Sequence, residues 1–176
     1  MSTTNWNVDP SHSEVTFKVK HMMITNVSGS FTDFNVTASS DGDDFSKANV
    51  NFSAKAASVN TGSAQRDGHL QSADFFDAEK YPEITFKSTS VEKDGDDYKL
   101  QGDLTIKDVT KNITLIAEHG GIGKDPYGNI KAGFTVTGKI NRKDFGLTWN
   151  AALETGGVMV SEEVKINCEI QLVKGA

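Results

Sequence analysis

The chain has 176 residues, of which 36% are hydrophobic and 24% charged, and its formal net charge is −6 at pH 7. A length of this order suits one hydrophobic core, so we expect residues 1–176 to form a single domain. Nucleic-acid binding needs clustered Lys and Arg, whereas lysines such as Lys18, Lys55 and Lys99 occur singly along the sequence. This pattern argues against nucleic acid as a partner.

Cysteine content and the first residues bear on the cellular compartment. The single cysteine, Cys168, excludes an internal disulfide and is compatible with a reducing compartment. Residues 1–5 lack the basic and apolar regions of a secretory signal, and no run of about 18 apolar residues exists to span a membrane. We expect a cytoplasmic protein without a membrane span, or a periplasmic one if a leader has been removed.

Apolar and polar residues alternate along most of the chain, which is typical of strands with one buried and one exposed face. The pattern recurs about eight times and is separated by turn residues at 39–42, 94–97, 108–111 and 123–129. Phe31 and Phe34 are three residues apart, which predicts a bulge near Thr32 and Asp33. The clearest rows of inward residues are Val15, Phe17, Val19 and His21; Ala48, Val50, Phe52 and Ala54; and Val164, Ile166, Cys168, Ile170 and Leu172.

Sheets with one apolar face must hide it in a two-sheet sandwich or in a closed barrel. An eight-stranded barrel has an interior that is filled by side chains or that holds one small ligand. Large inward residues such as Phe52 mix with small ones such as Ala54 and Gly102. This mixture fits an apolar channel and equally a dry core of interlocked side chains, so the alternation leaves both open.

Residues 61–78 interrupt the strands with a charged and aromatic insert that is far longer than a hairpin turn requires. We expect one or two short helical turns there, with Asn60, Thr61 or Ser63 as N-cap and with Gly68 and Pro82 limiting their extent. Two adjacent residues on a helix point in different directions. The insert therefore predicts a lid in which one ring plugs the barrel and the other packs on its rim, the two residues being Phe75 and Phe76.

Charged residues of the insert are expected to gather at the same rim. Arg66, Asp67, His69 and Asp74 would place a cation beside a histidine, which suits an anionic or hydroxylated head group. Alternatively, Arg66 pairs with Asp67, Asp74 or Asp144 and pins the insert onto the barrel. A second rim element is expected at 141–146, with Arg142 as its cation, and a gating loop at 150–160.

Neither a metal site nor a catalytic site is indicated. The four histidines, at positions 12, 21, 69 and 119, show no metal-ligand spacing, so we expect no metal and no cofactor. His21 ends an inward row and either contacts a ligand or is a hydrogen-bonded core residue. No nucleophile elbow or Gly-rich phosphate loop occurs, and Cys168 lies on the apolar face of the last strand.

Four motifs stand in order along the chain: Asp9-Pro-Ser-His-Ser, Arg66-Asp-Gly-His-Leu-Gln-Ser-Ala-Asp-Phe-Phe, Leu104-Thr-Ile and Asn141-Arg-Lys-Asp-Phe-Gly-Leu. Together they resemble the YceI family of lipocalin-like, polyisoprenoid-binding proteins over roughly residues 6 to 172. The resemblance implies an antiparallel barrel around an elongated apolar cavity that takes a long-chain isoprenoid or a similar amphiphile. It does not name the ligand.

We therefore expect an all-β protein: an eight-stranded antiparallel lipocalin-like barrel with a short helical insert near residues 61–78. Its expected function is to bind and sequester or carry a polyisoprenoid or other long-chain lipid. Alternatives are an enzyme that acts on a lipid-like substrate at Arg66, Asp67 and His69, and a solid-cored stress or structural protein. A homodimer is left open. The ligand-binding candidates are Phe17, Val19, His21, Phe34, Val50, Phe52, Arg66, Asp67, His69, Phe75, Phe76, Ile84, Phe86, Leu104, Phe134 and Arg142.

Overall fold

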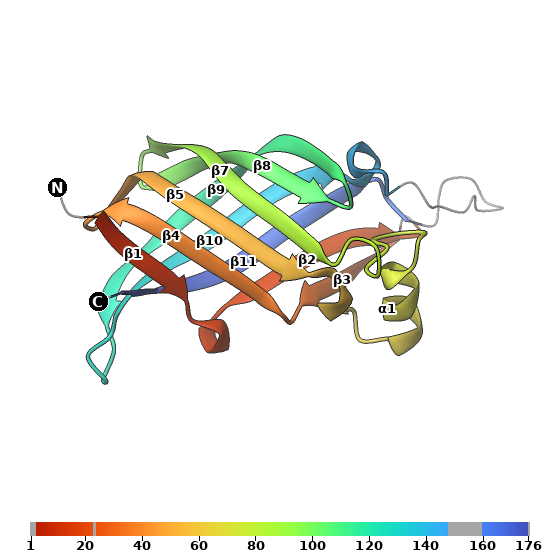
Figure 1. Ribbon diagram of the computed structural model, residues 1–176, viewed down its shortest axis with the longest axis horizontal. Helices are drawn as coiled ribbons and strands as arrows, with labels where there is room; N and C mark the ends of the chain where they lie inside the picture. Colours follow the sequence, from red (N-terminus) through yellow and green to blue (C-terminus); the bar gives the residue numbers. More distant parts are fainter. Residues whose placement is uncertain (1–2, 23, 148–159, 176) are drawn as a thin grey trace.

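Strands dominate the computed structural model, which describes residues 3–22, 24–147 and 160–175 (Figure 1). The helical elements are η1 (Pro10–His12), η2 (Ala56–Ser58), α1 (Ala64–Gln71) and η3 (Arg142–Phe145). The strands are β1 (Thr3–Val8), β2 (Glu14–His21), β3 (Thr25–Phe31), β4 (Phe34–Asp41), β5 (Asp44–Lys55), β6 (Val59–Asn60), β7 (Glu83–Asp94), β8 (Asp97–Ile106), β9 (Val109–Lys124), β10 (Ile130–Asn141) and β11 (Glu163–Lys174).

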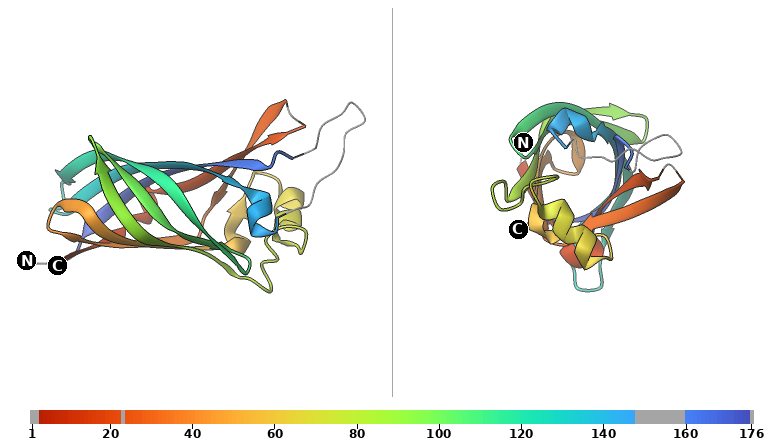
Figure 2. Two further views of the ribbon diagram at one scale, coloured as in Figure 1. Left: turned by 90° about the horizontal axis from the view of Figure 1, so that it is seen from above. Right: turned by 90° about the vertical axis from the view of Figure 1, so that its right-hand side faces the viewer.

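Three pairs of consecutive strands act as single bent strands, so the ring has eight members. β1 and β2 both pair with β11, with Val8 opposite Leu172 and, farther along, Phe17 opposite Ile166. β3 continues into β4, and β5 continues across η2 into β6. Each member pairs antiparallel with the next, and β11 returns to the first, so that the strands enclose a ring when seen from the end (Figure 2). The expected eight-stranded antiparallel barrel is confirmed.

The break in alternation at Thr32 and Asp33 coincides with the bend between β3 and β4. The neighbouring strand bends at the same level, since the Thr32 N–H donates to the Ser58 carbonyl at 3.2 Å and the Lys55 N–H donates to the Asp33 carbonyl at 2.9 Å. These two hydrogen bonds keep both strands paired through the irregular region, where an unpaired buried amide would be costly.

Aromatic side chains fill the barrel at the end where the two termini lie (Figure 1). We call them the aromatic plug: Trp6, Phe45, Tyr98, His119 and Phe134. The Phe45 ring lies 5.2 Å from that of Trp6 and 5.0 Å from that of Phe134, and the His119 ring stacks on Phe134 at 4.7 Å. Trp6 is 1% exposed, and its indole N–H donates to Ser40 Oγ at 2.8 Å. The plug therefore closes this end with dense, hydrogen-bonded packing.

The insert lies at the opposite end, as α1 followed by a turn that leads into β7 (Figure 2). Ser63 is the N-cap, because its Oγ accepts from the Arg66 N–H at 3.3 Å. The expectation that Gly68 limits the helix is wrong, since α1 runs through Gly68 to Gln71. A helix tolerates an interior glycine at a modest cost in free energy.

No helix within the described residues is long and apolar enough to cross a membrane. The gating loop expected at 150–160 falls almost wholly outside the described residues.

Candidate ligand-binding site

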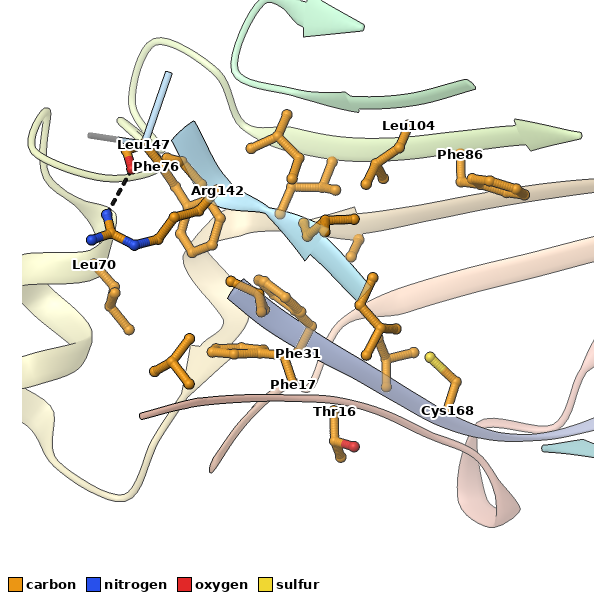
Figure 3. Close-up of a pocket in the computed structure, with 18 of the residues that line it drawn as sticks. Thr16, Phe17, Phe31, Leu70, Phe76, Phe86, Leu104, Arg142, Leu147 and Cys168 are labelled. Carbon is orange, nitrogen blue, oxygen red and sulfur yellow. Dashed lines mark hydrogen bonds between the residues drawn. The ribbon is translucent and has the colours of Figure 1, made fainter. Parts of the chain in front are cut away.

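A cavity of about 340 Å³ occupies the barrel between the aromatic plug and α1 (Figure 3). Its volume lies in the range of ~300–1,000 Å³ that is typical of small-molecule sites. Arg142, Leu70 and Phe76 lie at one end of the cavity, and Phe86 and Cys168 lie farther inside (Figure 3). The interior of this half of the barrel holds a cavity, so it is not the dry core of interlocked side chains that the sequence left as an alternative.

Strand alternation builds the cavity wall. Side chains two residues apart share one face of a strand, so β2 and β11 each contribute a row of inward groups. Cys168 belongs to the β11 row, and burial raises the pKa of its thiol to about 11. The two rows are Val15, Phe17, Val19 and His21 from β2, and Val164, Ile166, Cys168 and Ile170 from β11.

Glycines on neighbouring strands give the largest inward rings room to lie along the wall. Phe17 stands directly opposite Gly29, and a Cβ built on Gly29 would lie 2.8 Å from Phe17 Cε1. A Cβ built on Gly102 would lie 2.8 Å from Phe86 Cε2. Both distances are far below van der Waals contact, so only glycine lets these rings lie against the strand.

Two adjacent phenylalanines line the cavity at the α1 end. Phe75 is buried, with its ring 5.1 Å from that of His69, and the Phe76 ring lies 5.7 Å from that of Phe31. The expected division of roles, one ring plugging the barrel and the other on the rim, is wrong because both contribute to the cavity wall. They follow α1 in a turn, so helical geometry does not set them apart.

Thr61 is hydrogen-bonded to two charged side chains of the insert, Arg66 and Asp67. Arg66 donates from Nε to Thr61 Oγ1 and from Nη2 to the Thr61 carbonyl, both at 2.7 Å. Asp67 Oδ1 accepts from the Thr61 N–H at 2.8 Å and from its hydroxyl at 2.6 Å. His69 Nε2 lies 2.9 Å from Asp74 Oδ2. Within the described part of the chain no carboxylate lies within ion-pair distance of Arg66, so Thr61 holds it in place of the expected carboxylate.

Arg142 is 2% exposed and projects from η3 to the cavity. Among the described residues it donates to three backbone carbonyls: Nε to Ser161 at 2.8 Å, Nη1 to Leu147 at 2.6 Å and Nη2 to Val160 at 3.2 Å. Desolvation lowers the pKa of the guanidinium, and the charge of nearby Glu162 opposes that shift. Arg142 therefore ties the start of η3 to Leu147 after that helix and to residues 160–161 before β11. It also brings a positive charge to the mouth of an apolar cavity.

Most of the predicted binding residues come together in this cavity. Three do not line it: Phe34, Asp67 and Phe134, the last of which belongs to the aromatic plug. Leu70 of α1 lines the cavity without having been predicted, because a short insert gives no reliable helical phase. Leu147 also lines it unpredicted, because it follows η3 and lies outside the strand alternation. The predicted residues that do line it are Phe17, Val19, His21, Val50, Phe52, Arg66, His69, Phe75, Phe76, Ile84, Phe86, Leu104 and Arg142.

Within the described ranges no group of three or more His, Cys, Asp or Glu side chains is placed to hold a metal ion. The site combines an apolar wall with cations and hydrogen-bonding groups at its mouth.

Comparison with known proteins shows which family has this sequence and fold. The model of the YceI-like domain family matches residues 6–172. A UPF0312 protein of Staphylococcus aureus (strain N315) is 40% identical over 169 residues, which cover 96% of each chain. The crystal structure of the Campylobacter jejuni YCEI protein has a TM-score of 0.78 and 38% identity, covering 89% of this chain and 90% of that one.

Two solved structures with lower sequence identity share the fold. Burkholderia cenocepacia BcnA has a TM-score of 0.81 at 24% identity, covering 93% of this chain and 98% of its own. A polyisoprenoid binding domain from Saccharophagus degradans has a TM-score of 0.68 at 17% identity, covering 97% and 98%. Since the family model and the 40% identical relative both span nearly the whole chain, the protein belongs to the YceI-like domain family.

Proposed function

We propose that the protein binds a long-chain amphiphile, a polyisoprenoid in class, inside the barrel and carries or sequesters it. The observation that supports this proposal most directly is the cavity, whose wall is largely apolar from the aromatic plug to α1 and whose charged lining residues, Lys20, Arg66 and Arg142, lie toward the mouth. A ligand with an apolar chain and a polar end matches this distribution. No reaction is part of the proposal.

Burial of the chain would drive binding at roughly 25 cal/mol per Å² of apolar surface, less the entropy lost when a flexible chain is ordered. The family membership supports the same ligand class, because a structurally similar domain from Saccharophagus degradans is described as polyisoprenoid binding. The proposed contacts are the cavity-lining side chains, with Phe75 and Phe76 covering the chain near the mouth.

Filling the cavity tests the proposal. Ala54 is 2% exposed, and its methyl group lines the cavity. Ala54→Phe should weaken uptake of a fluorescent isoprenoid analogue by about tenfold or more, which corresponds to about 1.4 kcal/mol. Val50→Phe, at a second lining position, should do the same.

Asn51→Phe is the matched control, because residue 51 is exposed on the same strand. It adds the same ring outside the barrel and should leave uptake unchanged. Circular dichroism and the melting temperature establish that each variant is folded. Undiminished uptake in folded Ala54→Phe and Val50→Phe would show that the analogue binds elsewhere.

A further inference from the structure

The hairpin that joins β2 to β3 projects past the barrel mouth (Figure 2). Two large apolar side chains among its described residues are exposed near the tip, since Ile24 is 75% exposed and Met22 is 42% exposed. The tip adjoins the cavity, because His21 at the end of β2 lines it. Apolar groups are therefore presented to solvent beside the opening through which a ligand would pass.

Met22 occupies a conformation that its side chain does not favour. Its φ is 53°, in the left-handed region where glycine or asparagine is normally found. A glycine would make the same turn without strain. A large apolar side chain at a strained and exposed position is a feature that points to a role for that side chain outside the folded core.

Lysines form a row beside this hairpin on the outer face of the barrel. Lys18 of β2 stands directly opposite Lys165 of β11, and Lys165 stands directly opposite Lys139 of β10. All three are exposed, and like charges directly opposite one another destabilise a sheet. Glu163 lies 3.9 Å from Lys139. An external anionic surface would relieve the repulsion within this lysine row.

The charge that favours an anionic surface is local to the lysine row. The turns from β4 to β5 and from β7 to β8 at the plug end carry six aspartates, but lysines lie among them, and Lys174 is 3.7 Å from Asp43. The insert at the mouth carries carboxylates of its own, such as Asp67 and Asp74. The six aspartates are Asp41, Asp43, Asp44, Asp94, Asp96 and Asp97.

We propose that the mouth end docks on an anionic lipid bilayer. Met22 and Ile24 enter the boundary between head groups and acyl chains, and the lysine row contacts lipid phosphates. Two signals of this kind, apolar insertion and basic charge, act together in reversible membrane binding. The docked state places the cavity mouth against the lipid. Docking would serve to transfer a lipid chain between the bilayer and the cavity, and this purpose rests on the proposed function.

Cosedimentation of the full chain with vesicles tests the docking. The protein should sediment with vesicles of mixed phosphatidylcholine and phosphatidylglycerol, and much less with phosphatidylcholine alone. Ile24→Ser with Met22→Ser should weaken binding to the mixed vesicles, and so should Lys18→Gln with Lys165→Gln, each by about tenfold.

Matched controls lie elsewhere on the barrel. Ile116→Ser removes an exposed isoleucine from β9, and Lys87→Gln with Lys99→Gln neutralises two exposed lysines on β7 and β8. Both should leave sedimentation unchanged. Absence of sedimentation with mixed vesicles, or equal loss in test and control variants, overturns the docking proposal. Uptake of the isoprenoid analogue without vesicles is measured on the same variants, and its failure would count against the proposed function instead.

Discussion

The ring of Phe86 on β7 lies over the backbone of Gly102 on β8. A Cβ at position 102 would lie 2.8 Å from Phe86 Cε2 and 2.6 Å from the Lys87 carbonyl oxygen. The ring therefore rests on the strand next to it and leaves the centre of the barrel open. Small inward residues thus keep the cavity open indirectly, by giving large neighbours a place to lie.

Gly102→Ala should destabilise the protein by about 1 to 3 kcal/mol, because the methyl group overpacks the wall against a backbone carbonyl as well as a ring. Gly133→Ala is the control, since a Cβ there meets nothing within 4 Å. Urea denaturation measures both variants. Similar stability of Gly102→Ala and Gly133→Ala would mean that Phe86 and the Lys87 carbonyl can move aside at little cost in free energy.

Cys168 should be inert in the native protein. Its thiol pKa is raised to about 11 from an ordinary value of 9.0, so little thiolate forms at neutral pH. Labelling with a charged thiol reagent should be slow until denaturant is added. Fast native labelling would place the thiol on the outer face of β11, one residue out of register.

The same shift makes stability depend on alkaline pH. The folded state holds the thiol proton more tightly than the unfolded state, so stability is full below about pH 9 and is lost as the pH rises toward about 11. The loss should approach 2 to 3 kcal/mol, at about 1.4 kcal/mol per pKa unit. Cys168→Ala should remove this component, which urea titrations at several pH values would reveal.

His119 should make the aromatic plug sensitive to acid. Its Nε2 is buried without a hydrogen-bond partner among the described residues, and desolvation lowers the pKa of the imidazole from 6.5. Protonation therefore favours the unfolded state, so the stability present above pH 6.5 falls as the pH drops below that value.

His119→Phe should keep the stacking on Phe134 and weaken this acid dependence. Denaturation midpoints at about pH 5 and about pH 8 measure the effect on both proteins. A midpoint difference as large in His119→Phe as in the parent protein would assign the acid sensitivity to other groups.

Arg66→Gln should separate recognition of a head group from anchoring of the insert. If the guanidinium binds an anionic head group, affinity for a polyprenyl phosphate should fall by about 1.5 to 3 kcal/mol, and affinity for a neutral polyprenol should hardly change. The melting temperature should change little, because Arg66 is exposed and its guanidinium donates to Thr61 alone among the described residues. Lys80→Gln, two residues after the insert, is the charge control.

Equal loss of affinity for both ligands, together with a lower melting temperature, would instead make Arg66 an anchor of the insert. In that case the hydrogen bonds to Thr61 would be its whole role, and the head group would be recognised by other groups at the mouth.

The strands and their inward faces could be predicted because a barrel imposes one local rule on every strand. Val15, Phe17 and Val19 face inward simply because alternate residues share a face. Ser63 was one of three candidate caps, since a hydroxyl before a helix has a local partner in its first turn.

Features that depend on strand pairing could not be predicted in this way. Lys18, Lys139 and Lys165 are isolated in sequence, and only the register between strands aligns them. His119 faces Phe134 because the pairing of β9 with β10 shifts at Gly120, and the adjacent glycines at 120 and 121 do not by themselves give the new register. Two of the carbonyl partners of Arg142 come from residues 160 and 161, which a long segment separates from η3 in the sequence.

One edge of β11 is shared between β1 at the plug end and β2 on the mouth side. β1 pairs with this edge through Trp6, Asn7 and Val8, and β2 pairs with it through residues 14–18. The segment between the two strands is fastened to the same edge, because the Asp9 N–H donates to the Gln171 carbonyl at 2.8 Å and the Gln171 N–H donates to Ser13 Oγ at 2.9 Å. The edge of β11 is therefore hydrogen-bonded across the break between β1 and β2, and amide exchange at Gln171 should be as slow as at its neighbours in β11.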